Sequence, residues 1–197
     1  MSKISESLEY RWPQEGDRLI PDASSEANSE SFERSLDRHA DIWSGYLSAG
    51  RELAKLLLRG HSTEAEMLYP LLFCYRHGIE MALKWLVARF GGRYGLKAKD
   101  THNLWELWKD VATINCETGH SEGEVAAPEA LIRELHELDR TSEAFRYAVN
   151  RRGELIQLPS SAIDLAHLKD VMDGLSHFFE GFRIELEELS AFNNEGY

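Results

Sequence analysis

The chain has 197 residues, of which 43% are hydrophobic and 28% charged, and these proportions are typical of a globular protein with one well-filled core. Its formal net charge of −12 argues against general nucleic-acid binding, which needs a basic surface. A small basic pocket or a basic protein partner remains compatible with that charge. No run of about 18 apolar residues occurs, so we expect no membrane contact.

The N-terminus lacks the apolar segment of a secretory signal. The two cysteines, Cys74 and Cys116, form no C-x-x-C pair and are expected to be free thiols. Both features predict a cytoplasmic location.

Three regions follow from composition along the chain. Residues 1–30 are expected to form an extended arm, because a stretch with prolines and a glycine precedes the polar run 22–30. Residues 31–192 carry helical periodicity and are expected to form the folded bundle. Residues 193–197 are expected to be a short C-terminal tail.

Apolar residues at helical spacing predict about five helices, and therefore an all-α, up-and-down bundle. The first helix is expected from Ser31 to a stop at Gly60. The second is expected to follow a cap at Ser62 or Thr63 and to end at Gly91.

Three further helices are expected in the second half of the chain. The third is capped by Asp100 and Thr101, and the fourth begins at Pro128 and carries its apolar stripe as far as Val149. A turn and a short extended piece are expected over 152–159, after which Ser160 and Ser161 cap the fifth helix.

The second helix carries a polar column. Arg76, Glu80 and Lys84 are spaced four apart, so they lie on one face and form i,i+4 pairs, with His77 beside them. Polar groups next to a buried stripe need to pair with each other or with a ligand. The column is therefore either an ordinary salt-bridged face or part of a binding site, and His77 is either a packing residue or a catalyst.

His102 and Asn103 follow the expected cap of the third helix. His102 is expected either to hydrogen-bond across to the second helix and fix its packing, or to act in chemistry. Trp105 and Trp108 are expected to be core residues, because aromatic residues three apart on a helix usually pack.

Asp139, Ser142 and Arg146 are spaced three and four apart and are expected to form a second column, on the fourth helix, with Tyr147 near its end. The planar guanidinium of Arg146 suits a phosphate if it has a free edge. The alternative is a structural ion pair with Asp139.

Other chemistries find no support in the sequence. There is no P-loop, no dinucleotide glycine fingerprint, no H-E-x-x-H and no serine or cysteine in a nucleophile context. The eight histidines show no metal-ligand spacing, so we expect neither a metal nor a cofactor.

Taken together, three motifs resemble the HEPN superfamily of helical-bundle proteins. They are Tyr-Arg-His-Gly-Ile-Glu-x-x-Leu-Lys at 75–84, His-Asn-Leu-x-x-Leu-Trp at 102–108 and Asp-x-x-Ser-x-x-Phe-Arg-Tyr at 139–147. The resemblance covers about residues 64–190. It implies a bundle of four or five helices, frequently a homodimer, and a place in bacterial defence or toxin–antitoxin systems.

Many members of that superfamily are metal-independent ribonucleases. The resemblance implies for them an arginine followed four to six residues later by a histidine, late in the bundle. Arg146 fits the arginine position here, but Arg151, Arg152 and Gly153 occupy the region where the histidine is expected. The usual ribonuclease chemistry is therefore not expected.

Three hypotheses follow. The first is a non-catalytic binding or assembly module that contacts a nucleotide or phosphate, partnered by a nucleotidyltransferase or another defence-system subunit. The second is a ribonuclease with a variant site, in which Arg146 holds the RNA phosphate and His77 or His102 transfers protons. The third is an acidic helical scaffold that binds a basic protein. The candidate ligand-contacting residues are Arg76, His77, Glu80, Lys84, His102, Asp139, Ser142, Arg146 and Tyr147.

Overall fold

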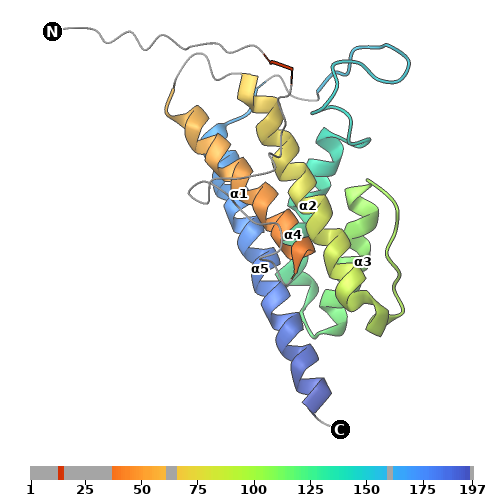
Figure 1. Ribbon diagram of the computed structural model, residues 1–197. Helices are drawn as coiled ribbons and strands as arrows, with labels where there is room; N and C mark the ends of the chain where they lie inside the picture. The colour runs from red at the N-terminus through yellow and green to blue at the C-terminus, as the bar shows by residue number, and fades with distance from the viewer. Residues whose placement is uncertain (1–12, 16–36, 61–65, 159–161, 196–197) are drawn as a thin grey trace, which may run out of the picture. The chain divides into compact units, whose positions relative to one another are not determined.

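The computed structural model describes residues 13–15, 37–60, 66–158 and 162–195. In these residues the structure is all helical and contains no β-strand, which confirms the predicted fold class (Figure 1). The elements are α1 (Arg38–Leu58), α2 (Leu68–Phe90), the 3-10 helix η3 (Gly91–Tyr94), α3 (Leu104–Glu117), α4 (Glu122–Leu138) and α5 (Leu165–Glu195).

The chain divides into two compact units, residues 1–36 and residues 37–197, and every described helix belongs to the second unit. Apart from residues 13–15, the arm expected over 1–30 lies outside the described residues. The expected start of the first helix (31–36) and the expected caps at Ser62, Thr63, Ser160 and Ser161 also lie outside them.

Helix α2 is central to the helical unit. It packs along α1 and also contacts α3 and α5, while α4 packs on α3 and α5 (Figure 1). This position explains why α2 buries residues around most of its circumference, from Leu71 to Phe90. A helix in the middle of a bundle has no wholly solvent-exposed face, so its polar residues must find partners inside the protein.

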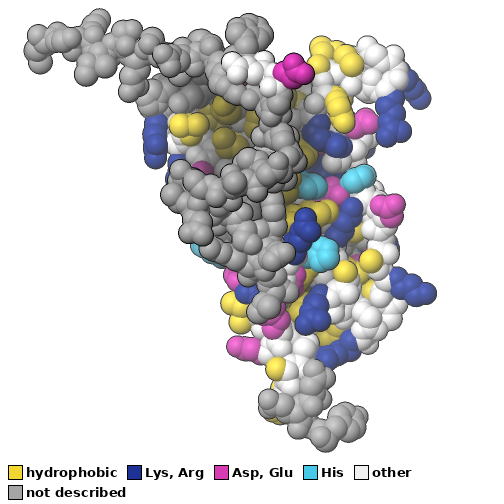
Figure 2. All heavy atoms as spheres, viewed as in Figure 1, with side chains coloured by type: hydrophobic (Ala, Val, Ile, Leu, Met, Phe, Trp, Pro, Cys, Tyr) yellow, Lys and Arg dark blue, Asp and Glu magenta, His cyan; other side chains and the backbone are white. Residues whose placement is uncertain are grey.

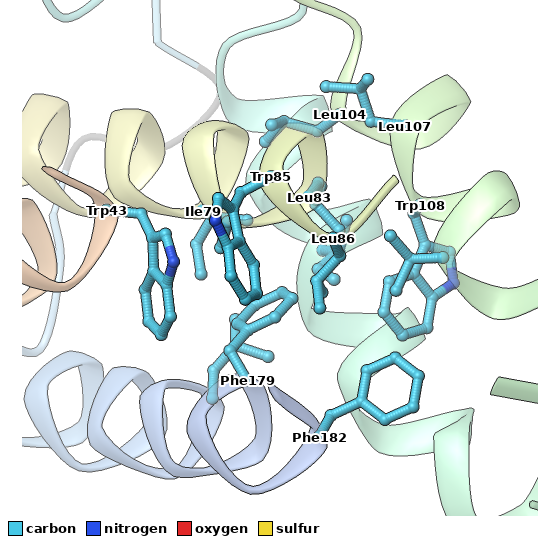
Figure 3. Close-up of a cluster of buried hydrophobic side chains, with 14 of the residues drawn as sticks. Trp43, Ile79, Leu83, Trp85, Leu86, Leu104, Leu107, Trp108, Phe179 and Phe182 are labelled. Atoms are coloured by element: carbon cyan, nitrogen blue, oxygen red, sulfur yellow. The ribbon is translucent and has the colours of Figure 1, made fainter. Parts of the chain in front are cut away.

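Large side chains from four helices fill the core around α2. Trp43 of α1, Trp85 of α2, Trp108 of α3 and Phe179 of α5 are each no more than 6% exposed (Figure 3). Full burial of a large apolar side chain contributes roughly 1.5–3 kcal/mol. The predicted core position of Trp108 is confirmed, whereas Trp105 is only half-buried and lies under the guanidinium of Arg133 at 3.9 Å.

Two glycines allow α1 and α2 to approach closely. A methyl group added at Gly50 would lie 2.7 Å from the ring of Tyr75. One added at Gly78 would lie 2.8 Å from the side chain of Leu47 and 3.2 Å from its backbone nitrogen. The absence of a side chain at these two positions therefore sets the distance between the helices.

At three helix starts, the residue that caps the helix differs from the predicted cap or was not predicted. Asp37 caps α1, and its carboxylate accepts hydrogen bonds from His39 N and Ala40 N. Asn103, and not Asp100 or Thr101, caps α3 through a bond from Glu106 N. At α5 the carboxylate of Asp164 accepts from the amides of residues 166 and 167.

The prediction for the fourth helix was wrong at both ends. Helix α4 begins at Glu122 after a capping box formed by Ser121 and Glu124, so Pro128 lies inside the helix. It ends at Leu138, eleven residues before the expected Val149. The segment 139–158 that follows is non-helical and carries four of the nine candidate site residues, Asp139, Ser142, Arg146 and Tyr147.

None of the described helices is long and apolar enough to cross a lipid bilayer. Cys74 and Cys116 are both free thiols, as predicted. Burial raises the pKa of the Cys74 thiol, so this side chain stays protonated.

Candidate functional site

The polar column on α2 is the centre of a buried ion-pair cluster. Arg76 and Glu80 are each 1% exposed, and Nη1 of Arg76 donates to Oε2 of Glu80 at 2.8 Å. Nη2 of Arg76 donates to the backbone carbonyl of His102 at 2.8 Å, and Nε lies 3.3 Å from Oδ2 of Asp139. One guanidinium thus connects α2, the loop before α3 and the end of α4.

Glu80 is the second hub of this cluster. Its Oε1 accepts from Nζ of Lys84 at 2.9 Å and lies 2.8 Å from Nδ1 of His102. Burial alone would raise the pKa of Glu80, but the hydrogen bonds from Lys84, His102 and Arg76 outweigh it and lower the pKa below its ordinary value. Glu80 is therefore an ionised carboxylate in the core.

The charges of this cluster balance. Arg76 and Lys84 supply two positive charges, and Glu80 and Asp139 supply two negative ones. Each of the three guanidinium nitrogens of Arg76 has an acceptor inside the protein, and a buried arginine with a balanced charge is typical of a structural ion pair rather than of a phosphate contact. We therefore assign Arg76, Glu80 and Asp139 to the structure of the fold, in agreement with the ion-pair interpretation of the α2 column.

Asp139 does not lie on a helix with Ser142 and Arg146, so the predicted second column was wrong. Oδ1 of Asp139 accepts from the backbone amides of Glu143 at 2.9 Å and Ala144 at 3.2 Å. Ser142 has a φ of 62°, the left-handed region, and is the one non-glycine residue with positive φ among those that the structure describes. The carboxylate that pairs with Arg76 therefore also folds the chain back after α4.

Arg146 has a different environment from Arg76. Its Nε donates to the carbonyl of Ser142 at 2.7 Å, and Nη2 donates to the same oxygen. Its guanidinium carbon lies 5.9 Å from the ring centre of Phe73 and 5.3 Å from that of Tyr147. Among the described residues it has no carboxylate partner, so its charge remains unneutralised and its Nη1 has no hydrogen-bond acceptor.

A groove of about 310 Å³ lies beside Arg146. Its walls are the first turn of α2, which supplies Tyr69, and the segment after α4, which supplies Phe145, Arg146 and Tyr147. Tyr69 is 51% exposed and Tyr147 is 55% exposed. Figure 2 shows hydrophobic side chains (yellow) next to lysine and arginine side chains (dark blue) over this part of the molecule.

A tight backbone turn supports the far wall of the groove. Val149 and Leu155 form an isolated antiparallel bridge, and the side-chain oxygen of Asn150 accepts from Arg152 N and Glu154 N. This turn corresponds to the short extended piece that the sequence indicates before the fifth helix. It exposes Arg151 and Arg152 next to the groove, although Nε of Arg151 also lies 3.3 Å from Glu143.

His77 lies between aromatic rings and not in the ion-pair cluster. Its ring is stacked on Phe73, with centres 5.3 Å apart, and meets the edge of Tyr46 at 4.5 Å. Burial lowers the pKa of His77, and the charges of Lys84, Arg146 and Arg76 act in the same direction against the opposing effect of Glu80. His77 is thus a neutral packing residue, as one of the two sequence interpretations had it.

His102 makes the predicted contact with the second helix, and its side chain is also accessible to solvent. It pairs with Glu80 across to α2, yet its side chain is 62% exposed. Because its Nδ1 faces the carboxylate, its Nε2 is the ring nitrogen left for solvent or a ligand. Among the described residues, no three histidine, cysteine or acidic side chains lie close enough together to hold a metal ion.

Comparisons of the chain with protein-family models, curated proteins and solved structures find no significant match.

The structure thus brings seven of the nine predicted site residues into two groups, while His77 packs between aromatic rings and Ser142 lies in the turn after α4. The ion-pair cluster contains Arg76, Glu80, Lys84, His102 and Asp139. The groove is lined by Arg146 and Tyr147. Two residues of α2 that face Arg146, Tyr69 and Phe73, were not among the predicted site residues. Their i,i+4 spacing was a usable signal, but it is also that of ordinary core packing.

Proposed function

We propose that this chain is a HEPN-like binding module whose groove at Arg146 holds a nucleotide or another phosphate-bearing ligand. One observation carries the proposal: the guanidinium of Arg146 lines an open groove, and no described carboxylate neutralises its charge. The contrast with Arg76, whose charge is fully matched, supports Arg146 as the ligand-contacting arginine.

The shape of the groove fits the parts of a nucleotide. Nη1 of Arg146 offers a charge-assisted donor to a phosphate oxygen. Tyr69 and Tyr147 present exposed rings on which a base can stack, an interaction worth roughly 1–3 kcal/mol per base. The net charge of −12 limits the affinity for long nucleic acids and favours a small or single-site ligand.

The test is titration of the protein with ATP and, separately, with inorganic triphosphate by isothermal calorimetry. We expect Arg146→Ala to weaken binding about 10–100-fold, because a hydrogen bond to a charged group contributes about 1.5–3 kcal/mol. Arg93→Ala is the matched control, since it removes the same charge from η3, beyond the opposite end of α2 from Tyr69. Equal affinities in the Arg146 and Arg93 variants would contradict the proposal.

On the basis of the resemblance to the HEPN superfamily, we also propose that the protein forms a homodimer. The same resemblance suggests a protein partner, such as a nucleotidyltransferase of a defence system. The mass of the purified protein in solution, by light scattering, tests the dimer. A monomer at all concentrations up to the millimolar range would remove that part of the proposal and leave the ligand site unaffected.

A second candidate function has a specific observation in its favour. The buried, ionised Glu80 orients the exposed imidazole of His102 at 2.8 Å, and a carboxylate that orients a histidine is the usual arrangement of a general acid/base. This dyad supports the variant ribonuclease, with His102 in place of the missing family histidine. His77 is disfavoured for the role because it is packed between two rings.

Cleavage of single-stranded and structured RNA in the presence of EDTA tests the second candidate. His102→Gln is expected to abolish cleavage, whereas His77→Phe, which preserves the aromatic packing, is expected to retain it. If the wild-type protein leaves both RNAs intact, the ribonuclease function is excluded and the binding module remains.

A further inference from the structure

A second pocket shares no lining residue with the Arg146 groove. It has a volume of about 260 Å³ and opens between α2, α4 and α5. For comparison, an apolar cavity of about 150 Å³ is enough to bind benzene. Apolar side chains from all three helices form its walls, among them Leu72, Leu131, Leu135, Leu168 and Met172.

One of the lining residues, Tyr75, has a buried hydroxyl without a hydrogen-bond partner among the described residues. Tyr75 lines the pocket, is 2% exposed, and its hydroxyl makes no hydrogen bond with any part of the chain that the structure describes. Leaving a buried hydroxyl unsatisfied is unfavourable, and native proteins rarely do so without a reason. Burial, with a contribution from Asp173, raises the pKa of Tyr75 to about 12, so the hydroxyl is a hydrogen-bond donor at neutral pH.

The charged side chains at the rim of the pocket are acidic. Its titratable residues besides Tyr75 are Glu134, Asp164 and His167, and the described residues that line it include no lysine or arginine. Oδ1 of Asp164 is occupied by the first amides of α5, whereas Glu134 is exposed and has no ion-pair partner among the described residues. Such a rim repels anions and attracts an ammonium group.

We propose that this pocket binds a small apolar amine that carries a hydrogen-bond acceptor within its apolar part. The apolar body fills the space between α4 and α5, an ether or carbonyl oxygen accepts from the hydroxyl of Tyr75, and the ammonium group lies at the rim beside Glu134. The apolar body of the ligand matches the volume of the pocket, its oxygen supplies an acceptor for the hydroxyl of Tyr75, and its ammonium group matches the acidic residues at the rim.

Three matched probes test this proposal. 4-Phenoxybutylamine has the ether oxygen and the amine, and 5-phenylpentylamine replaces the oxygen with a methylene group. 4-Phenoxybutyric acid has a carboxylate in place of the terminal aminomethyl group. Binding is followed on protein labelled with ¹³C at the methionine methyl groups. Met172 lines the pocket and reports occupancy, while the other three methionines serve as internal references.

We expect the ether amine to shift the Met172 signal and to bind about 2–10-fold more tightly than the ether-free amine, the range for one neutral hydrogen bond. The acid is expected to bind more weakly than both amines. Glu134→Gln, an exposed substitution that leaves the core intact, is expected to reduce or abolish the preference for the amine over the acid.

Two variants probe the interior. Tyr75→Phe is expected to remove the preference for the ether, and Val171→Phe is expected to fill the pocket and abolish binding. Absence of any Met172 shift with all three probes would overturn the proposal. Equal binding of the acid and the amines, or of the two amines, to wild-type protein would also overturn it. None of these results depends on nucleotide binding at Arg146.

Discussion

Arg76 of α2 and Asp139 at the end of α4 form a buried ion pair, with Nε of the guanidinium 3.3 Å from Oδ2 of the carboxylate. The two residues are 63 positions apart in the sequence. The pair lies beside the Arg76–Glu80 bridge, so a single guanidinium is held between two carboxylates in the core. The same Asp139 binds the amides of Glu143 and Ala144, which links the charge cluster to the loop that carries Arg146.

Asp139→Ala tests how much this pair contributes to the stability of the protein. We expect it to destabilise the protein by about 3–5 kcal/mol, the usual effect of breaking a buried ion pair, because the charge balance of Arg76 is lost and two loop amides lose their acceptor. Urea denaturation followed by circular dichroism measures the change. The control is Glu137→Ala, an exposed substitution near the end of the same helix that should change stability by less than about 0.5 kcal/mol.

The close contact between α1 and α2 predicts opposite effects for two glycine-to-alanine substitutions. At Gly78 the new methyl group would lie 2.8 Å from Leu47, so we expect Gly78→Ala to destabilise the protein by about 1–3 kcal/mol through overpacking. At Gly45 of α1 nothing lies within 4 Å of the new methyl group, so Gly45→Ala should stabilise by about 0.5–1 kcal/mol through helix propensity. Thermal denaturation distinguishes the two signs, and stabilisation by both would show that the helices are farther apart.

The pKa of His77 predicts a pH dependence of stability. Because the folded pKa lies below the ordinary value of 6.5, the unfolded chain binds the proton more readily, and stability falls as the pH falls below 6.5. Burial also lowers the pKa of His136, which makes a further contribution to the loss of stability at low pH. His77→Phe should therefore reduce, but not abolish, the loss of unfolding free energy below pH 6.5, as measured by urea denaturation across pH. Identical slopes for the two proteins would contradict a neutral, packed His77.

Tyr147 tests whether the groove recognises a base as well as a phosphate. Tyr147→Leu should weaken ATP binding by roughly 1–3 kcal/mol through loss of stacking, while Tyr147→Phe should retain most of it. Neither variant should change binding of inorganic triphosphate, because that ligand has no base. If both ligands weaken equally in Tyr147→Leu, the ring positions Arg146 and does not contact the ligand.

The candidate site was only partly predictable from the sequence. The spacing of Arg76, Glu80 and Lys84 predicts their mutual pairing, since i,i+4 neighbours meet on any helix. The spacing of Asp139, Ser142 and Arg146 obeys the same rule, but the helix ends at Leu138. The run Asp139-Arg140-Thr141-Ser142 contained a signal for that end, because such side chains compete for backbone hydrogen bonds and favour turns.

By itself, the sequence determines the helical class, the apolar stripe of α2 and the pairs within one helix, because these depend on neighbours three and four residues apart. Only the tertiary structure decides that Asp139 leaves its helix to pair with Arg76, that Tyr69 and Arg146 face one groove, and that the buried hydroxyl of Tyr75 has no partner in the part of the chain that the structure describes. The physical reason is that burial of a charge or a hydroxyl depends on which distant segments surround it. Periodicity along the chain does not show which segments these are.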